Sequence, residues 1–274
     1  MSASLAIVGG GRMGEALAAG LLTAGWAGLV VTERLPDRRQ ELSAHLSAHF
    51  AGADIAVVDE LPPCDAAVIA VKPTDVEAAC RAVAGAGSRR VLSIAAGVTI
   101  ARLQEWLDSA GGADQRAPAV LRAMPNTPAL VGAGASALAP APDADAEDLE
   151  WARSVLAAVG TVEVVPEALL DAVTGLSGSG PAYVFLVAEA LIDAGVLAGL
   201  PRPVAERLTV QTIAGSGRLL AESGQSPAEL RAAVTSPGGT TAAGLRALEA
   251  RAVRAAVLEA VVAAAARSRA LGAG

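Results

Sequence analysis

Aromatic side chains are scarce in this chain, which has three Trp, one Tyr and two Phe among 274 residues. A folded core must therefore be packed mainly from Ala, Val, Leu and Ile. The composition is nonetheless 53% hydrophobic and 18% charged, which is typical of a chain that buries a core and excludes a disordered one. The length fits one large domain or two modest ones.

Cysteine and histidine are equally rare. The two cysteines, Cys64 and Cys80, are too few for a disulfide framework or a zinc cluster, so we expect each to be a small buried hydrophobic residue. His45 and His49 have the i, i+4 spacing of a metal pair on a predicted helix, but the segment offers no third ligand. We therefore predict a solvated helix face there and no metal site.

The chain also lacks an excess of basic charge and a long apolar run. Its net charge of −7 argues against a nucleic acid or an acidic membrane as partner, although a few local cations and backbone amides can still hold a phosphate-bearing cofactor. No run free of Gly, Pro and charge reaches about 18 residues, and no signal peptide opens the chain. We expect a cytoplasmic protein.

Short apolar runs alternate with helical patterns as far as about residue 165. The helices are expected from Arg12 to about Ala24, over Pro36–Ser47, from a Thr74 cap through Val83, from a Thr99 cap to about Leu107, and over Ala146–Ala158. This alternation predicts a parallel, doubly wound sheet. The strand candidates are Leu5–Val8, Leu29–Thr32, Ile55–Val58, Ala66–Val71, Val91–Ile94, Ala119–Ala123, Ala133–Leu138 and Thr161–Val165.

Beyond residue 165 the patterns are helical. The segments are Glu167–Val173, Pro181–Leu197, Pro201–Glu222, Pro227–Val234 and Ala242–Leu271. The last is predicted to be one continuous helix, because Ala250-Arg251-Ala252 contains no glycine break. The fold class is therefore α/β, with a Rossmann-type dinucleotide-binding domain over residues 1–165 and an all-helical domain over 166–274.

A glycine-rich turn follows the first strand and precedes the first helix. In this motif Gly9 makes the tight turn, Gly11 admits a pyrophosphate and Gly14 lets helix and strand pack closely. The context predicts a dinucleotide site. Its expected members are Val8, Gly9, Gly10, Gly11, Arg12, Met13 and Gly14.

Further cofactor contacts are expected where the later strands end. Glu33 could bind a ribose 2′-hydroxyl as in NAD enzymes, whereas the fork of donors on Arg34 suits a 2′-phosphate. We favour NADP(H) with NAD(H) possible; the alternative for Arg34 is a solvated surface charge. The other expected contacts are Ala70, Val71, Lys72 and Pro73 after one strand and Ala96 after the next.

The segment Ser236-Pro237-Gly238-Gly239-Thr240-Thr241 precedes a helical run. Its glycines let a ligand approach the backbone, and Thr240 and Thr241 are natural N-cap residues. Free N–H groups at a helix start suit a carboxylate, although an ordinary helix entry would have the same composition.

Strong acid–base or nucleophilic machinery is missing. We find no nucleophile elbow, no Ser/His/Asp set and no paired carboxylates. A dinucleotide site without such groups indicates hydride transfer to an acceptor that is already activated.

Four strings carry a family likeness over nearly the whole chain. Together they resemble pyrroline-5-carboxylate reductase, which implies hydride transfer from NAD(P)H to Δ1-pyrroline-5-carboxylate, giving L-proline in the last step of proline synthesis. The resemblance also implies a helical domain that dimerises, dimers that can form decamers, and an active site between the two domains. The strings are Met124–Pro128, Asp171–Tyr183, Gln211–Thr212 and Ser236–Thr241.

The resemblance assigns roles to individual residues. Ser236, Gly239, Thr240 and Thr241 are expected to bind the substrate, with the Thr241 hydroxyl near the ring nitrogen as the catalytic group. Asn126 is expected to contact the cofactor. Glu167 matches a position near the substrate, with a helix N-terminal charge as its equal alternative.

Three features depart from the family, and two other functions compete. The family usually has a glycine break after Leu248-Glu249, where this chain has Ala250-Arg251-Ala252. Ile55–Val58 lacks an asparagine that many relatives carry, and Glu33 stands where a neutral residue is usual. One competing hypothesis is a dinucleotide-binding scaffold without catalysis. The other is an oxidoreductase like the β-hydroxyacid dehydrogenases, which use a lysine on the first interdomain helix; Pro181–Leu197 contains none.

Overall fold

The computed structural model describes residues 4–111 and 117–272, which form two compact units. We call residues up to Ser179 together with those from Ala263 onward the sheet unit, and Gly180–Val262 the helical unit. The sequence boundary at residue 165 follows the last strand, and as a domain boundary it stays a prediction.

The sheet unit is built on eight strands in the order β3-β2-β1-β4-β5-β6-β7-β8. Neighbouring strands are parallel except for the β6–β7 pair, which is antiparallel, so β7 and β8 run opposite to the other six strands. All eight predicted strands are present, although β4 ends at Ile69, two residues early. Their bounds are β1 Leu5–Val8, β2 Leu29–Thr32, β3 Ile55–Val58, β4 Ala66–Ile69, β5 Arg90–Ser93, β6 Ala119–Met124, β7 Gly134–Pro140 and β8 Gly160–Val164.

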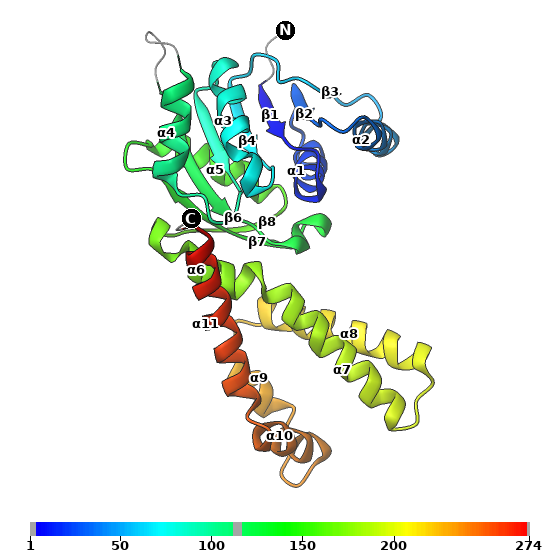
Figure 1. The fold of residues 1–274 in the computed structure, drawn as a ribbon. Helices are drawn as coiled ribbons and strands as arrows, with labels where there is room; N and C mark the ends of the chain where they lie inside the picture. The colour runs from blue at the N-terminus through cyan, green and yellow to red at the C-terminus, as the bar shows by residue number, and fades with distance from the viewer. Residues whose placement is uncertain (1–3, 112–116, 273–274) are drawn as a thin grey trace. The chain divides into compact units, whose positions relative to one another are not determined.

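Helices cover both faces of this sheet (Figure 1). Because successive strand residues point to opposite faces, Ala6 and Val8 pack with α3 (Val76–Gly85) and α4 (Ile100–Ala110). Leu5 and Ile7 pack instead with α1 (Arg12–Thr23), α2 (Pro36–His49) and α5 (Ala146–Ala157). The doubly wound fold is confirmed.

Both cysteines lie in the core on the α3 and α4 face. Burial raises the pKa of the Cys80 thiol to about 12. The Cys64 sulfur lies 3.0 Å from the hydroxyl oxygen of Ser88. Their prediction as buried hydrophobic residues is confirmed.

Helix starts were predicted with mixed success. Thr99 caps α4 as expected, accepting a hydrogen bond from the Arg102 N–H at 3.2 Å. The Thr74 cap is wrong, because Pro73 starts a 3₁₀ turn, η1 (Pro73–Asp75), and α3 begins only after it. Glu77, in the first turn of α3, pairs with Arg81.

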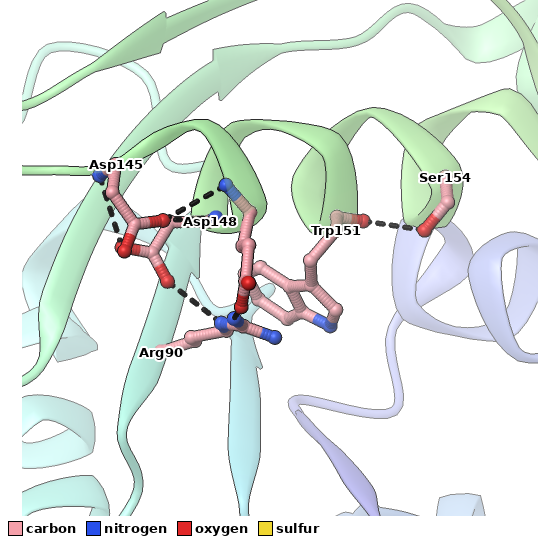
Figure 2. Close-up of polar contacts among 6 residues, drawn as sticks. Arg90, Asp145, Asp148, Trp151 and Ser154 are labelled. Carbon is pink, nitrogen blue, oxygen red and sulfur yellow. Dashed lines mark hydrogen bonds and ion pairs between the residues drawn. The ribbon is translucent and has the colours of Figure 1, made fainter.

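A capping box does start α5 (Figure 2). The Asp145 carboxylate accepts from the N–H groups of Glu147 and Asp148, and the Asp148 carboxylate accepts from the Asp145 N–H. Asp148 also pairs with Arg90 of β5 at 2.7 Å, which ties the helix to the sheet.

The segment after β8 is helical, as predicted. Glu167–Leu169 (η3) and Leu170–Val173 (α6) lead into a π-helical turn, η4 (Thr174–Gly178). The helical unit then contains α7 (Gly180–Leu197), α8 (Arg202–Glu222), α9 (Pro227–Ala233), α10 (Thr240–Ala250) and the first part of α11 (Val253–Gly272).

The prediction of one continuous helix over 242–271 is wrong. The chain breaks between α10 and α11 at Ala252, whose φ of +54° is left-handed. The Arg251 and Ala252 N–H groups bond back to the carbonyls of Leu248 and Glu249, as at a helix C-terminus. Alanine adopts this conformation only at a steric cost. Because no glycine stands at this position, the sequence did not indicate the break.

Candidate active site

The glycine turn after β1 has the geometry that its three glycines predicted. Gly9 has φ of +114°, and a Cβ on Gly14 would lie 2.0 Å from the Gly9 carbonyl oxygen. A Cβ on Gly11 would meet nothing within 4 Å. The first and third glycines therefore serve the turn and the helix contact, and the second faces open space at the start of α1.

A bond network missed by the sequence reasoning holds this turn. Arg38 of α2 donates through Nε to the Gly10 carbonyl at 2.9 Å and pairs with Glu15 of α1 at 2.5 Å. The hydrogen bond to the Glu15 carboxylate raises the pKa of Arg38. The turn is thus fixed from both flanking helices.

The other predicted cofactor segments share the same edge of the sheet. The Ala70 N–H bonds to the Val8 carbonyl at 2.8 Å, and the Ile94 N–H bonds to that of Ile69 at 3.0 Å. The segments after β1, β4 and β5 are therefore neighbours. Lys72 and Pro73 are exposed there, and Ala96 is half-buried.

Glu33 and Arg34, after β2, differ in their surroundings. The Glu33 carboxylate accepts from the Leu35 N–H at 2.9 Å. Arg34 is exposed, and no hydrogen bond or ion pair joins it to another described residue. Arg34 lines a cavity of about 390 Å³ together with Val8 and Val71. Three acids, Asp59, Glu60 and Asp75, line the same cavity.

Asn126 is buried, and both ends of its amide contact backbone groups. Its Nδ2 donates to the Ser177 carbonyl at 3.0 Å, and its Oδ1 accepts from the Ala135 N–H at 2.8 Å. A cofactor contact by this residue stays a prediction.

Glu167 is the first residue of η3, as its alternative interpretation required, and its carboxylate also contacts the start of α4. Its Oε1 accepts from the Ile100 N–H at 2.7 Å and pairs with Arg122 at 3.0 Å. Arg122 is itself buried in β6. The charge inside an otherwise apolar strand was a signal for this partner that the sequence reasoning did not use. The substrate role of Glu167 stays a prediction.

In the helical unit, Ser236–Gly239 forms a tight turn with Pro237 and Gly238 at its centre. Gly238 has φ of +71°, and the Gly239 N–H bonds to the Ser236 carbonyl at 3.1 Å, which is a type II pattern. A Cβ on Gly239 would lie 2.4 Å from the Ser236 Oγ and 3.2 Å from the Ser236 carbonyl oxygen, so a larger residue there would displace the Ser236 side chain.

The predicted N-cap role of Thr240 and Thr241 is wrong, because Gly239 is the N-cap of α10. Both threonines are helical residues in the first turn, and no side chain caps that helix start. The N–H groups of Thr240, Thr241 and Ala242 therefore have no intrahelical acceptor. They can bind an anion, with the exposed Thr241 hydroxyl beside them.

The histidine pair lies on the exposed face of α2, with its rings stacked at 4.3 Å. Over residues 4–111 and 117–272, no group of three or more His, Cys, Asp or Glu side chains could hold a metal ion.

Known proteins match this chain from end to end. A family model described as pyrroline-5-carboxylate reductase dimerisation matches residues 167–271, and one described as NADP oxidoreductase, coenzyme F420-dependent, matches residues 4–97. Pyrroline-5-carboxylate reductase from Synechocystis is 44% identical over 99% of both chains.

Solved structures agree. A reductase of this name from Coxiella burnetii is 33% identical, covers 99% of both chains and has a TM-score of 0.87. The Plasmodium falciparum enzyme, solved with NADP bound, is 30% identical over 98% of both chains with a TM-score of 0.79. The chain belongs to the pyrroline-5-carboxylate reductase family.

Family membership explains why the apolar side chains of the helical unit are largely exposed. Among them, Phe185 is 61% and Leu258 is 68% exposed. One helical stretch of the described chain, Glu167–Leu197, is even long and apolar enough to span a membrane. Because the dimerisation model covers that stretch, these surfaces belong to a self-association domain.

Proposed function

We propose that this protein reduces Δ1-pyrroline-5-carboxylate to L-proline with NAD(P)H, the last step of proline biosynthesis. The observation that carries the proposal is the end-to-end likeness to reductases of this name. The glycine turn fits a dinucleotide, because Gly11 leaves open space where a pyrophosphate must approach the start of α1. NADPH, when bound, supplies the hydride.

The protein's own contribution is mainly to bind and orient. The free N–H groups of Thr240 and Thr241 hold the substrate carboxylate, and the Ser236–Gly239 turn keeps side chains away from it. The Thr241 hydroxyl donates to or accepts from the ring nitrogen and keeps the imine aligned. A threonine is too weak an acid to be the final proton source, so water or substrate that is already protonated provides the proton.

The preferred cofactor is NADPH. Arg34 has no competing partner among the described residues, so its guanidinium is free to pair with a 2′-phosphate. NADH remains usable, because carboxylates suit a ribose 2′-hydroxyl. Glu33 is one such group, and the acids that line the Arg34 cavity are others.

Assembly and location follow the same proposal. The helical unit joins two chains into a dimer, and dimers assemble further, up to a decamer. The enzyme works in the cytoplasm without a membrane or nucleic acid partner, consistent with its net charge of −7.

The experiment is to follow NADPH oxidation with Δ1-pyrroline-5-carboxylate and with simple 2- and 3-keto acids. We expect turnover with the imine only; turnover of a keto acid alone would replace the proposal with a dehydrogenase of the β-hydroxyacid kind. NADPH binding without turnover of either class would leave a scaffold.

A pair of variants tests the role of Thr241. We expect Thr241→Val to lower kcat/KM for the imine about tenfold or more, since it removes a hydrogen bond and keeps the shape. Thr241→Ser keeps the hydroxyl and should stay within about threefold of the wild type. Equal kinetics for both variants would remove Thr241 from the mechanism.

A further inference from the structure

The segment Glu167–Leu197 contains a carbonyl that its own helix cannot satisfy. In an α-helix the carbonyl of Ser177 would accept from the N–H of residue 181. Residue 181 is proline, which has no N–H, and it is buried. The Ser177 carbonyl is only partly buried, and a polar group shielded from water is costly without a partner, so a donor from elsewhere would stabilise it.

Asn126 provides that donor. Its Nδ2 lies 3.0 Å from the Ser177 oxygen, 51 residues along the chain, and its side chain is held in place by the Ala135 N–H at 2.8 Å. Only 8% of the residue is exposed. It is also the only asparagine among the 274 residues, so the chain uses this side chain nowhere else.

The bond lies at an irregular turn of the backbone. Residues Thr174–Gly178 form the π-helical turn η4, closed by the Ser179 N–H on the Thr174 carbonyl at 2.8 Å. A Cβ on Gly178 would lie 2.8 Å from Met124 Cε, so η4 also packs directly on the end of β6. Single π turns of this kind are frequent at functional sites.

The π-helical turn η4 determines which side chains lie beside the predicted cofactor edge of the sheet. Thr174 and Ser179, at its two ends, line a cavity of about 210 Å³ together with Ala96 and Gly97 after β5. A shift of η4 would therefore move both hydroxyls relative to the Ala96–Gly97 segment. The Asn126–Ser177 bond opposes such a shift, because it holds the Ser177 carbonyl, to which Pro181 cannot donate.

We propose that Asn126 is a positioning residue: it replaces the N–H that Pro181 lacks and so fixes η4 against the cofactor edge of the sheet. This inference rests on the proposed function. It differs from the expectation that Asn126 binds the cofactor directly, and the two roles respond differently to a change at residue 181.

The test is a double-mutant cycle between Asn126→Ala and Pro181→Ala, because alanine at 181 restores the missing N–H. We expect Asn126→Ala to lower kcat with the imine and NADPH about tenfold in the wild-type background. In the Pro181→Ala background the same change should cost at most about threefold. The lost acceptor for the Ala135 N–H is common to both backgrounds and cancels.

The outcomes separate the roles. An equal loss of kcat in both backgrounds, or an equal rise in the NADPH dissociation constant in both, overturns the proposal; the second result would assign a direct cofactor contact. A loss of melting temperature with unchanged kcat would show a structural role only and would also overturn it. If Asn126→Ala does not fold, Asn126→Asp serves in the same cycle, since it removes the donor but keeps the shape and the acceptor.

Two controls complete the design. Pro227→Ala changes another proline at a helix start and should give no rescue. Wild-type turnover is measured first: an inactive wild type contradicts the proposed function, whereas an active wild type with no coupling contradicts only the role of Asn126.

Discussion

The sheet unit and the helical unit bury their apolar residues very differently. The largest fully buried side chains, among them Leu5, Leu103 and Leu121, all belong to the sheet unit. Within Gly180–Val262 only Pro181, Ala205 and Thr209 are buried, while Leu197 is 90% exposed. The first unit completes its own core, and the second has apolar faces that need a second copy of the chain.

The difference also separates the spectroscopic signals. The three tryptophans, Trp26, Trp106 and Trp151, and both cysteines lie in the sheet unit, whereas the single tyrosine, Tyr183, lies in the helical unit. Tryptophan fluorescence therefore follows the sheet unit alone, and far-ultraviolet circular dichroism follows both. Each unit can be perturbed and observed separately.

The largest effect is expected from a charge on the exposed face of α7. Phe185→Asp removes about 2–3 kcal/mol of burial per chain, and a symmetric dimer contains the change twice. The dimer dissociation constant should rise about a thousandfold, as measured by sedimentation equilibrium. The tryptophan signal of native protein should stay unchanged.

The matched control lies in the sheet unit. Val131 of η2 (Thr127–Val131) is 81% exposed, so Val131→Asp alters an apolar surface residue outside the helical unit. It should leave the dimer intact. If both variants dissociate, or neither does, the contrast between the two units as self-association surfaces is wrong.

The second effect distinguishes two glycines of the turn after β1. Gly14→Ala places a Cβ 2.0 Å from a backbone oxygen, so the turn must shift, at a cost on the order of 3 kcal/mol. Tryptophan-monitored melting should fall by roughly 10 °C. Gly11→Ala meets nothing within 4 Å and should leave the melting temperature unchanged.

The same pair separates stability from binding. Gly11→Ala should nevertheless raise the NADPH dissociation constant, because its methyl group occupies space that a pyrophosphate needs. Unchanged NADPH affinity in a stable Gly11→Ala protein would mean that the cofactor does not approach this glycine.

Most of the sheet unit could be predicted from local sequence. Runs such as Leu5–Val8 are continuously apolar and end at glycine or proline, so both strand and turn are visible without tertiary information. The antiparallel direction of β7 was not predicted, because direction depends on how the chain returns to the sheet. The break at Ala252 was missed because an alanine with positive φ looks like any helical alanine.

The site was predictable where a single segment determines it. The tight turn at Gly9 and the close helix contact at Gly14 follow from the glycine spacing, and the structure has both, whereas the pyrophosphate contact of Gly11 stays a prediction. Bonds between distant segments were not predictable: Asn126 meets Ser177, and the Ser268 hydroxyl donates to Asp171 across 97 residues. Sequence spacing carries no information on such pairs. The single asparagine of the chain, Asn126, could still be singled out from the sequence as a candidate for a specific contact.

The third effect concerns the left-handed residue of the helical unit. Ala252→Gly should stabilise the folded protein by about 1 kcal/mol, because glycine adopts positive φ without the steric cost of a Cβ. Ala247→Gly, inside α10, should instead destabilise it by about 1 kcal/mol. The measurement is urea unfolding followed by circular dichroism. A destabilised Ala252→Gly protein would contradict a left-handed residue at this break.

The smallest effect compares helix starts in the two units, since α5 has a side-chain cap and α10 has none. Hydrogen bonds from the Asp148 and Glu147 N–H groups lower the pKa of Asp145 below its ordinary value of 3.8. The carboxylate thus stabilises the fold above the unfolded pKa, and this contribution is lost as the pH falls through the lower folded pKa.

Asp145→Asn keeps a good N-cap but cannot titrate. The wild type should therefore exceed the variant slightly in urea midpoint at pH 7, and the difference should shrink as the pH falls below 3.8 and disappear below the lowered folded pKa. Fluorescence of Trp151, six residues beyond Asp145 in α5 (Figure 2), reports on this helix. A difference that stays constant with pH would show that the cap acts through shape and not through charge.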